Sequence, residues 1–456
     1  MLTIVAFIVA LGLLIAVHEY GHYRVAVACG VKVLRFSVGF GKTLYRWQPK
    51  RPRAGQSTEF VIGAFPIGGY VKMLDEREGA VAPDERHRAF NTQPLKARAA
   101  IVAAGPAANL LLAVLLYAVV NWYGVQEPKA ILASPVAGSV AQQAGLQGGE
   151  RVDQAGFEGE VLRNVESFED LRWLLTRGAL DSRDVRLVVT GRTGGGRELL
   201  LPLSGLNAKD ADAQLFRKVG ILGPYTPAVI GKVVPGHAAD KAGLRMGDVV
   251  LSVGGKAVVD GQQLRELIRG SVAAGQGVRA PWIVNRGNAT LELEVMPQPV
   301  TEGDVTIGRI DAFVGAPPDF VLVRYGPLDG LWKGVERTWE VSVLTVRMMG
   351  RMVIGQASLK NLSGPLTIAD YAGKSASLGL TQYLVFLALI SVSLGVLNLL
   401  PLPVLDGGHL MYYLWEGVTG RSVSNAWMER LQRGGVAVLL VMMSIALFND
   451  VTRLFG

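Results

Sequence analysis

Two histidines and a glutamate lie close together in the first apolar segment of the chain, as His18, Glu19 and His22. Thr3 is the only polar residue before them, and ionisable groups in such a segment are costly in a membrane and usually functional. Residues four apart project from one face of a helix, so both imidazoles point the same way. Zinc binds such a pair, and the adjacent glutamate can act as a base. The spacing predicts a metal hydrolase with its site inside the membrane.

A catalytic zinc site needs a third protein ligand and one open position. Asp406 is the candidate, at the end of the third apolar segment. Pro401 and Pro403 cannot continue a regular helix, so the backbone there must line a polar cavity or be buried in protein. We therefore expect the Asp406 carboxylate at the depth of the two histidines. Two alternatives remain: Asp406 could be a turn residue before two glycines, or His409 could be the ligand.

The net charge of +8 is concentrated in one loop of the sequence. Residues 24–98 contain 14 Lys and Arg against 6 Asp and Glu, an excess equal to the whole net charge. Because basic loops stay in the cytoplasm, this excess indicates a membrane orientation and no nucleic-acid partner. Both chain ends and residues 123–377 are then expected outside, which in a bacterial inner membrane is the periplasm. The active site is expected toward the cytoplasmic side.

Two other features of the N-terminal region bear on compartment. No basic residue precedes the apolar segment, which argues against the alternative that it is a cleaved signal peptide. Cys29 is the only cysteine, so no disulfide can form within the chain. The large external region must therefore be stable without one.

An internal repeat organises the region after the second apolar segment. Residues 144–150, AGLQGGE, match residues 242–248, AGLRMGD. The order of strand, short helix, this motif, strand, helix and strand resembles circularly permuted bacterial PDZ domains. Such domains take peptide termini onto a sheet edge, and residues 219–221 are a candidate loop for receiving a chain end. The alternative is that one or both copies are rigid obstacles without a ligand.

Two further segments have recognisable patterns. Residues 58–74 contain two apolar, strand-like pieces joined through PIGG, and predict a hairpin. Gly68 and Gly69 there would let a substrate backbone approach closely, although an ordinary cytoplasmic hairpin is the alternative. Residues 328–354 form an amphipathic helix with two tryptophans, suited to the membrane interface or to packing against the repeats.

Taken together, these motifs resemble the site-2 protease family of intramembrane zinc metalloproteases. The resemblance rests on HEYGH at 18–22, GPAAN at 105–109 and NLLPLPVLDG at 398–407, and covers essentially the whole chain. It implies that His18, His22 and Asp406 bind zinc, that Glu19 is the general base, and that Asn398 helps to hold the substrate. It also implies a re-entrant hairpin.

The resemblance extends to the branch of the family that regulates sigma-E signalling. It implies single-pass membrane proteins as substrates, among them an anti-sigma factor and remnant signal peptides. For Gly105 and Asn109, small-residue spacing favours close helix packing over a catalytic role.

We therefore expect an α-helical polytopic membrane protein with four transmembrane helices, a membrane-associated β-hairpin and two external PDZ domains. Its expected activity is cleavage of single-pass proteins, within or near their membrane span, after their ectodomains are trimmed. Two other functions compete: a non-catalytic PDZ scaffold, which has no need of Glu19, and a metal transporter. The expected segments are 1–27 (span), 28–98 (loop with the hairpin 58–74), 99–122 (span), 125–217 and 218–300 (PDZ domains), 319–375 (interfacial helix), 378–402 (span), 403–433 (loop) and 434–450 (span).

Overall fold

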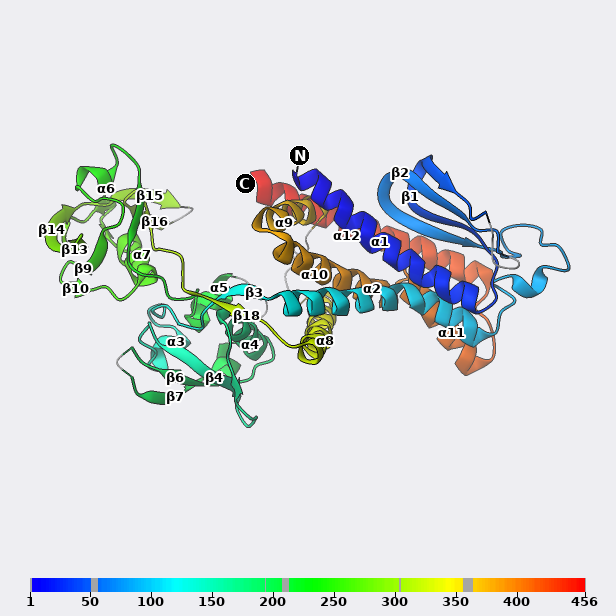
Figure 1. The fold of residues 1–456 in the computed structure, drawn as a ribbon, viewed down its shortest axis with the longest axis horizontal. Coiled ribbons are helices and arrows are strands. Elements are labelled where there is room, and N and C mark those ends of the chain that lie inside the picture. The colour runs from blue at the N-terminus through cyan, green and yellow to red at the C-terminus, as the bar shows by residue number, and fades with distance from the viewer. Residues whose placement is uncertain are drawn as a thin grey trace. The chain divides into compact units, whose positions relative to one another are not determined.

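The structure is a computed structural model that describes residues 2–50, 56–192, 194–206, 213–302, 305–355 and 364–455. The chain divides into two compact units, Met1–Val125 with Arg324–Gly456, and Gln126–Val323. The first unit is a helical bundle with one curved sheet, and the second contains two small domains built around sheets (Figure 1).

Within the described residues, four helices of the first unit are long and apolar enough to cross a membrane, which equals the number of spans that the sequence predicts. The fourth is longer than predicted, because the helix already begins at Asn425 and its apolar stretch covers Ala426–Thr452. These helices are α1 (Leu2–Ala28), α2 (Leu95–Tyr123), α10 (Leu380–Leu399) and α12 (Asn425–Phe455).

Glycines allow the spanning helices to cross closely. A Cβ on Gly21 of α1 would lie 2.4 Å from the carbonyl oxygen of Ala104 in α2, and a Cβ on Gly395 of α10 would lie 3.1 Å from that of Pro106. At the same level the Ser391 hydroxyl of α10 donates to a carbonyl of α2 over 2.7 Å. Small residues and buried hydroxyls are typical of helix contacts in membranes, and here they bring α1 and α10 against α2.

The described part of this unit contains four other helices: η1 (Arg86–Arg88), α8 (Pro327–Val353), α9 (Pro365–Leu378) and α11 (Asp406–Thr419). Helix α8, from the predicted interfacial region, packs on α2, where a Cβ on Gly334 would lie 2.7 Å from the Val114 carbonyl oxygen. The start of α9 is tied to the end of α12. The Asp450 carboxylate, fully buried, accepts from the backbone amides of Gly364, Leu366 and Thr367 and so satisfies donors that a helix start leaves free.

The sheet of the first unit differs from the predicted hairpin. It consists of β1 (Val33–Trp47) and β2 (Glu59–Met73), which are both bent (Figure 1). The first half of β1 pairs with both halves of β2, since Ser37 lies opposite both Val61 and Tyr70. The partner strand therefore precedes the predicted segment 58–74 instead of lying within it. Residues 69–73 form one edge of the sheet, beside α1.

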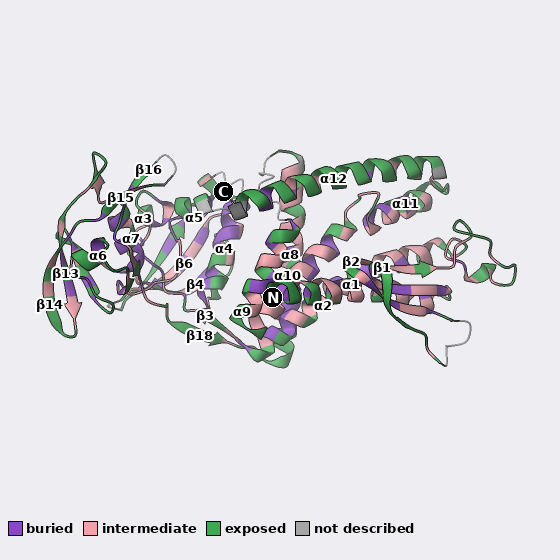
Figure 2. Cartoon of the chain, turned by 90° about the horizontal axis from the view of Figure 1, so that it is seen from above, coloured by how far each residue is buried: buried purple, intermediate pink, exposed green. Residues whose placement is uncertain are grey.

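The second unit contains two domains of the same plan, each with a four-stranded sheet and its own buried core (Figure 2). The first sheet has the order β5-β4-β6-β7 and the second β10-β9-β13-β14. The elements of the first domain are α3 (Val140–Gln143), β4 (Arg151–Phe157), β5 (Arg163–Asn164), α4 (Phe168–Leu180), β6 (Val185–Thr190), β7 (Gly196–Leu201), η2 (Leu203–Leu206) and α5 (Ala213–Val219). Those of the second are β8 (Ile230–Val233), α6 (Ala238–Lys241), β9 (Val249–Val253), β10 (Lys256–Ala257), α7 (Gly261–Arg269), β11 (Val272–Ala273), β12 (Gln276–Gly277), β13 (Ala280–Arg286), β14 (Ala289–Val295), β15 (Gln298–Glu302), β16 (Val305–Arg309) and β17 (Ala312–Val314). The strands β3 (Val125–Pro128) and β18 (Phe320–Val323) pair with each other.

Each domain extends beyond the boundary expected from the sequence. Val219 and Ile221, placed by the prediction at the start of the second domain, are buried in the core of the first. In the same way β17 lies after residue 300 but pairs with β8 and contributes Val314 to the second core. In the second copy the last strand thus returns to pair with the first, and in the first copy a single bridge joins Leu132 and Pro224 in a similar way.

The acidic residue that follows each AGLxxG motif is paired with an arginine of its own domain. The Arg286 guanidinium donates to Asp248 at 2.7 and 2.8 Å and to the Gly243 carbonyl oxygen at 2.7 Å. Arg197 contacts Glu150 and the Gly145 carbonyl oxygen in the same way. Burial alone would raise the pKa of Asp248, but hydrogen bonds from Arg286 and from a backbone amide hold that pKa below its usual value.

We expect Arg286→Met to destabilise the second domain by about 1.5–3 kcal/mol at neutral pH, because it removes charged hydrogen bonds from a fully buried carboxylate. A lowered native pKa stabilises the fold above the unfolded value of 3.8, and this contribution disappears as pH falls from there through the native pKa. The deficit of the variant should therefore shrink near pH 3. Hydrogen exchange of β13 amides in wild type and in Arg286→Met measures the loss of unfolding free energy. An equal loss at pH 7 and pH 3 would contradict its assignment to Asp248.

A second buried carboxylate is shared by the two domains. Asp260 precedes α7 and is fully buried; one oxygen accepts from the Gln263 amide over 2.8 Å and caps that helix. The other oxygen accepts from the backbone amide and the hydroxyl of Ser134, in the first domain, at 2.5 and 2.6 Å. One side chain therefore completes a helix in one domain and fixes a loop of the other.

Candidate active site

Three metal-binding atoms converge in the helical bundle. His18 Nε2 lies 3.2 Å from His22 Nε2 and 3.2 Å from Asp406 Oδ2, and His22 Nε2 lies 3.5 Å from the same oxygen. The histidines come from α1 and the aspartate from the first turn of α11, 384 residues later than His22 in sequence. The structure thus brings together the three residues that the sequence had singled out.

The spacing of these atoms fits zinc. With bonds of about 2.0–2.1 Å, two ligands of a tetrahedral zinc ion are about 3.3 Å apart. The three distances of 3.2 to 3.5 Å bracket that value. Two imidazoles and one carboxylate are also a donor set that catalytic zinc sites use, with the fourth position left for water or substrate.

Two glycines allow Asp406 to reach the histidines. Residues 400–405 leave the helical path at Pro401 and Pro403, and α11 begins directly afterwards. A Cβ on Gly407 would lie 2.1 Å from the Leu400 carbonyl oxygen, and a Cβ on Gly408 would lie 2.3 Å from that of Leu402. Only glycines permit this contact between the turn and the new helix, so the LDGG sequence places the carboxylate.

Glu19 lies beside the three ligand candidates without joining them. Together with His22 and Asp406 it lines a cavity of about 230 Å³, which also has Val71 and Met73 of β2 on its wall. A carboxylate in this position can accept a proton from a water molecule in the cavity. The geometry therefore separates a cluster of three donor atoms from a nearby carboxylate on the cavity wall.

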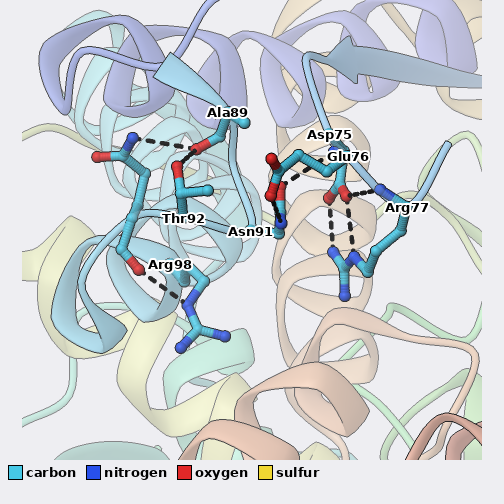
Figure 3. Close-up of polar contacts among 8 residues, drawn as sticks. Asp75, Glu76, Arg77, Ala89, Asn91, Thr92 and Arg98 are labelled. Carbon is cyan, nitrogen blue, oxygen red and sulfur yellow. Dashed lines mark hydrogen bonds and ion pairs between the residues drawn. The ribbon is translucent and has the colours of Figure 1, made fainter. Parts of the chain in front are cut away.

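A loop after β2 closes part of the same cavity. Asp75 lines it, and both of its carboxylate oxygens are held by the Arg77 side chain at 2.9 and 2.6 Å. Figure 3 shows this pair next to the hydrogen bond from Asn91 to Glu76, which ties the loop to the segment before α2. Burial alone would raise the pKa of Asp75, but Arg77 holds that pKa below its usual value. Arg77 therefore keeps the Asp75 carboxylate ionised and paired.

The remaining predicted residues lie near this centre in different ways. Gly69 is next to α1, where an added Cβ would lie 2.9 Å from Glu19 Cγ, while Gly68 sits in the bend of β2 with φ of 120°. Asn398 is half-buried in the last turn of α10, just before Pro401. The competing ligand His409 packs against the Tyr412 ring and is outside the cluster of three.

For two residues of α2 that contact the histidines, the sequence favoured packing over a catalytic role. An added Cβ on Gly105 would lie 2.2 Å from His22 Nε2, and Asn109 Nδ2 lies 3.3 Å from His18 Nδ1. The Ile101 carbonyl oxygen also lies 2.8 Å from His22 Nδ1. A polar side chain within an apolar span was the available signal for Asn109; the carbonyl leaves none in a sequence.

Comparison with known proteins gives a consistent result over the whole chain. The sequence model of the family described as Peptidase family M50 matches residues 6–442. A Ralstonia nicotianae protein named "Putative zinc metalloprotease" is 42% identical, with 100% of this chain and 99% of the relative covered. Protease RseP of Yersinia pestis is 39% identical over 99% of both chains. Regulator of sigma-E protease RseP of Escherichia coli is 38% identical over 98% of both.

Proposed function

Because the chain belongs to peptidase family M50 and is a zinc metallopeptidase, we propose that His18, His22 and Asp406 hold its zinc ion and that Glu19 is its general base. The observation that carries this proposal is the convergence of three donor atoms at zinc spacing beside Glu19. A structural metal site would have no use for that fourth group, which argues against a scaffold role.

The chemistry divides between the ion and the chain. Zinc in this position supplies a Lewis acid that polarises the scissile carbonyl and activates water. Glu19 accepts the proton of the attacking water and passes it to the leaving amine, a transfer that its place on the cavity wall permits. Asn398, at the end of α10, would hold the substrate backbone, and the turn at Pro401 and Pro403 would shape the adjoining wall.

The proposed substrates are single-pass membrane proteins with trimmed ectodomains, cut within or near the span. Support comes from the position of His18 and Glu19 on an apolar helix, where a soluble substrate has no access. An anti-sigma factor and remnant signal peptides are the physiological candidates, in line with the names of the relatives. The chain would lie in a bacterial inner membrane with residues 126–323 in the periplasm and the site toward the cytoplasm.

The test of this function is cleavage of a model single-pass substrate by the purified chain in detergent. We expect one cut inside or beside the span, located by mass spectrometry, that disappears with a zinc chelator and returns with zinc. Intact substrate under all conditions, with zinc bound to the enzyme, would contradict the proposed activity.

The two repeat domains are proposed to be PDZ domains that exclude bulky ectodomains and can bind peptide termini. Their sheets with one long helix, α4 or α7, support this assignment. Deleting residues 126–323, the whole second unit, should permit cleavage of a substrate with an untrimmed ectodomain. If the enzyme without the two domains cleaves trimmed substrate and still rejects the untrimmed one, the proposal that these domains exclude bulky ectodomains is wrong.

An edge of the curved sheet is the proposed substrate clamp. A membrane helix must be unwound before its peptide bonds can react, and an edge strand can pair with the extended segment. Residues 69–73 offer such an edge, and Val71 and Met73 within it line the cavity that contains Glu19. The substrate would then lie across the cavity as an additional strand.

We expect Gly68→Val to raise KM about tenfold, which corresponds to about 1.4 kcal/mol of lost binding. The valine would strain a backbone with φ of 120° and would place a Cβ 2.2 Å from the Phe40 ring, so the bend that carries the edge would shift. Gly79→Val is the matched control, because its Cβ would have no atom within 4 Å. Steady-state cleavage measures both, and an unchanged KM in the Gly68 variant would contradict the clamp.

A further inference from the structure

One face of α2 follows both zinc-site histidines. Ile101, Gly105 and Asn109 are spaced four apart, so they lie along one side of the helix. The first contacts His22 Nδ1 through its carbonyl oxygen, the second leaves room for His22 Nε2, and the third contacts His18 Nδ1. In each ring α2 reaches Nδ1, while Nε2 is directed at Asp406.

The Nδ1 atoms therefore have a defined chemical state in the zinc-loaded site. An imidazole that binds a metal through Nε2 carries its proton on Nδ1, so the group opposite must accept a hydrogen bond. The Ile101 carbonyl oxygen, 2.8 Å from His22 Nδ1, meets this requirement. His18 needs an acceptor too, and Asn109 is the side chain that faces its Nδ1, at 3.3 Å.

The hydrogen bonds of Asn109 point to the same role. The residue is 1% exposed, and its Oδ1 has no hydrogen-bond partner among the residues that the structure describes. Its backbone oxygen is already engaged by the Ser391 hydroxyl, which fixes α2 at this level. A half-turn of the amide exchanges oxygen and nitrogen with little change in shape. It would bring the unpaired Oδ1 to the position opposite His18 Nδ1.

We propose that Asn109 is a positioning residue for the metal site, whose Oδ1 accepts the Nδ1 proton of His18 and thereby fixes that ring with Nε2 toward the zinc. The inference rests on the proposed zinc ligands and goes beyond the packing role that the sequence favoured. Helix α2 then orients both imidazoles, one through a backbone carbonyl and the other through a side chain. Only the second contact can be removed by substitution.

The test compares zinc affinity in the full-length enzyme, by competition with a chromophoric chelator. Asn109→Leu keeps the approximate size but removes the acceptor, and we expect zinc to bind about 10–100-fold more weakly. Asn109→Asp keeps an acceptor oxygen and should restore most of the affinity. Asn121→Leu is the matched control, since Asn121 lies on the same helix and donates to the Gly330 carbonyl oxygen, away from the histidines.

A spectroscopic readout separates ligand orientation from general damage. With Co²⁺ in place of zinc, the visible absorption bands should shift in Asn109→Leu and return toward wild type in Asn109→Asp. Asn109→Ala provides a second acceptor-free variant if the leucine does not fold, judged by thermal unfolding without metal. Wild-type affinity and spectrum in a folded acceptor-free variant would overturn the proposal. Failure of wild type itself to bind one zinc would instead overturn the ligand assignment.

Discussion

Glu19→Gln should reduce the cleavage rate at least about 100-fold while the enzyme keeps its zinc. The amide matches the carboxylate in shape but cannot take a proton from water. Because Glu19 lies outside the cluster of His18, His22 and Asp406, its replacement leaves all three donor atoms in place. Substrate cleavage and zinc content, measured on the same preparation, check both halves of the expectation.

Glu78→Gln is the matched control for this prediction. Glu78 lines the same cavity, but its side chain is 61% exposed and its ion pair with Lys72 is long, at 3.9 Å. Its variant should cleave at close to the wild-type rate. Equal activity of wild type and Glu19→Gln would assign the base to another group, and loss of zinc from Glu19→Gln would make that residue part of the metal site.

Gly105→Ala should be almost as damaging, although it adds one methyl group at a residue that does no chemistry. The new Cβ would lie 2.2 Å from His22 Nε2, and both groups are in the packed interior between α1 and α2. The ring must move away from its ligand position, and a displacement of about 1 Å at an active site can cost about 100-fold in rate. Zinc affinity should fall with activity, in contrast to Glu19→Gln.

The control for this substitution is Gly12→Ala in α1. A Cβ at Gly12 would have no atom within 4 Å. The change should leave cleavage unaffected and stabilise the helix by up to about 1 kcal/mol, the difference in helix propensity. Wild-type zinc affinity in Gly105→Ala would show that the ring has room to move, and would remove the steric reason for a glycine here.

The sequence predicted the elements of the site whose signals are local. Two histidines four apart lie on one face of any helix, and two prolines interrupt the third span just before Asp406, so His18, His22 and Asp406 could be grouped before their distances were known. The four spans were recognisable from length and composition alone, and each is an apolar helix. The extent of the fourth was underestimated most, and α2 begins four residues before the predicted second span.

What the sequence did not predict depends on contacts between distant segments. β1 was missed because its residues include glycines and charges and because it is stabilised by pairing with both halves of β2. The role that we propose for Asn109 depends on which face of α2 meets α1, and the sequence alone does not show this. The domain boundary at 217 was misplaced for a similar reason: Val219 ends α5 and Ile221 follows it, and both are buried in the first core.

The carboxylate of Asp260 limits how far the two repeat domains are modular. It accepts a hydrogen bond at the start of α7 and two more from Ser134, so separating the domains would leave one oxygen of a buried carboxylate without its donors. Repeated domains can in principle be exchanged separately, but a cut near residue 225 separates Ser134 from Asp260 and so breaks the hydrogen bonds between them. The two domains should therefore unfold in one cooperative transition and be inherited together. Either domain transferred alone into another protein would need a new hydrogen-bond partner in place of Asp260 or Ser134.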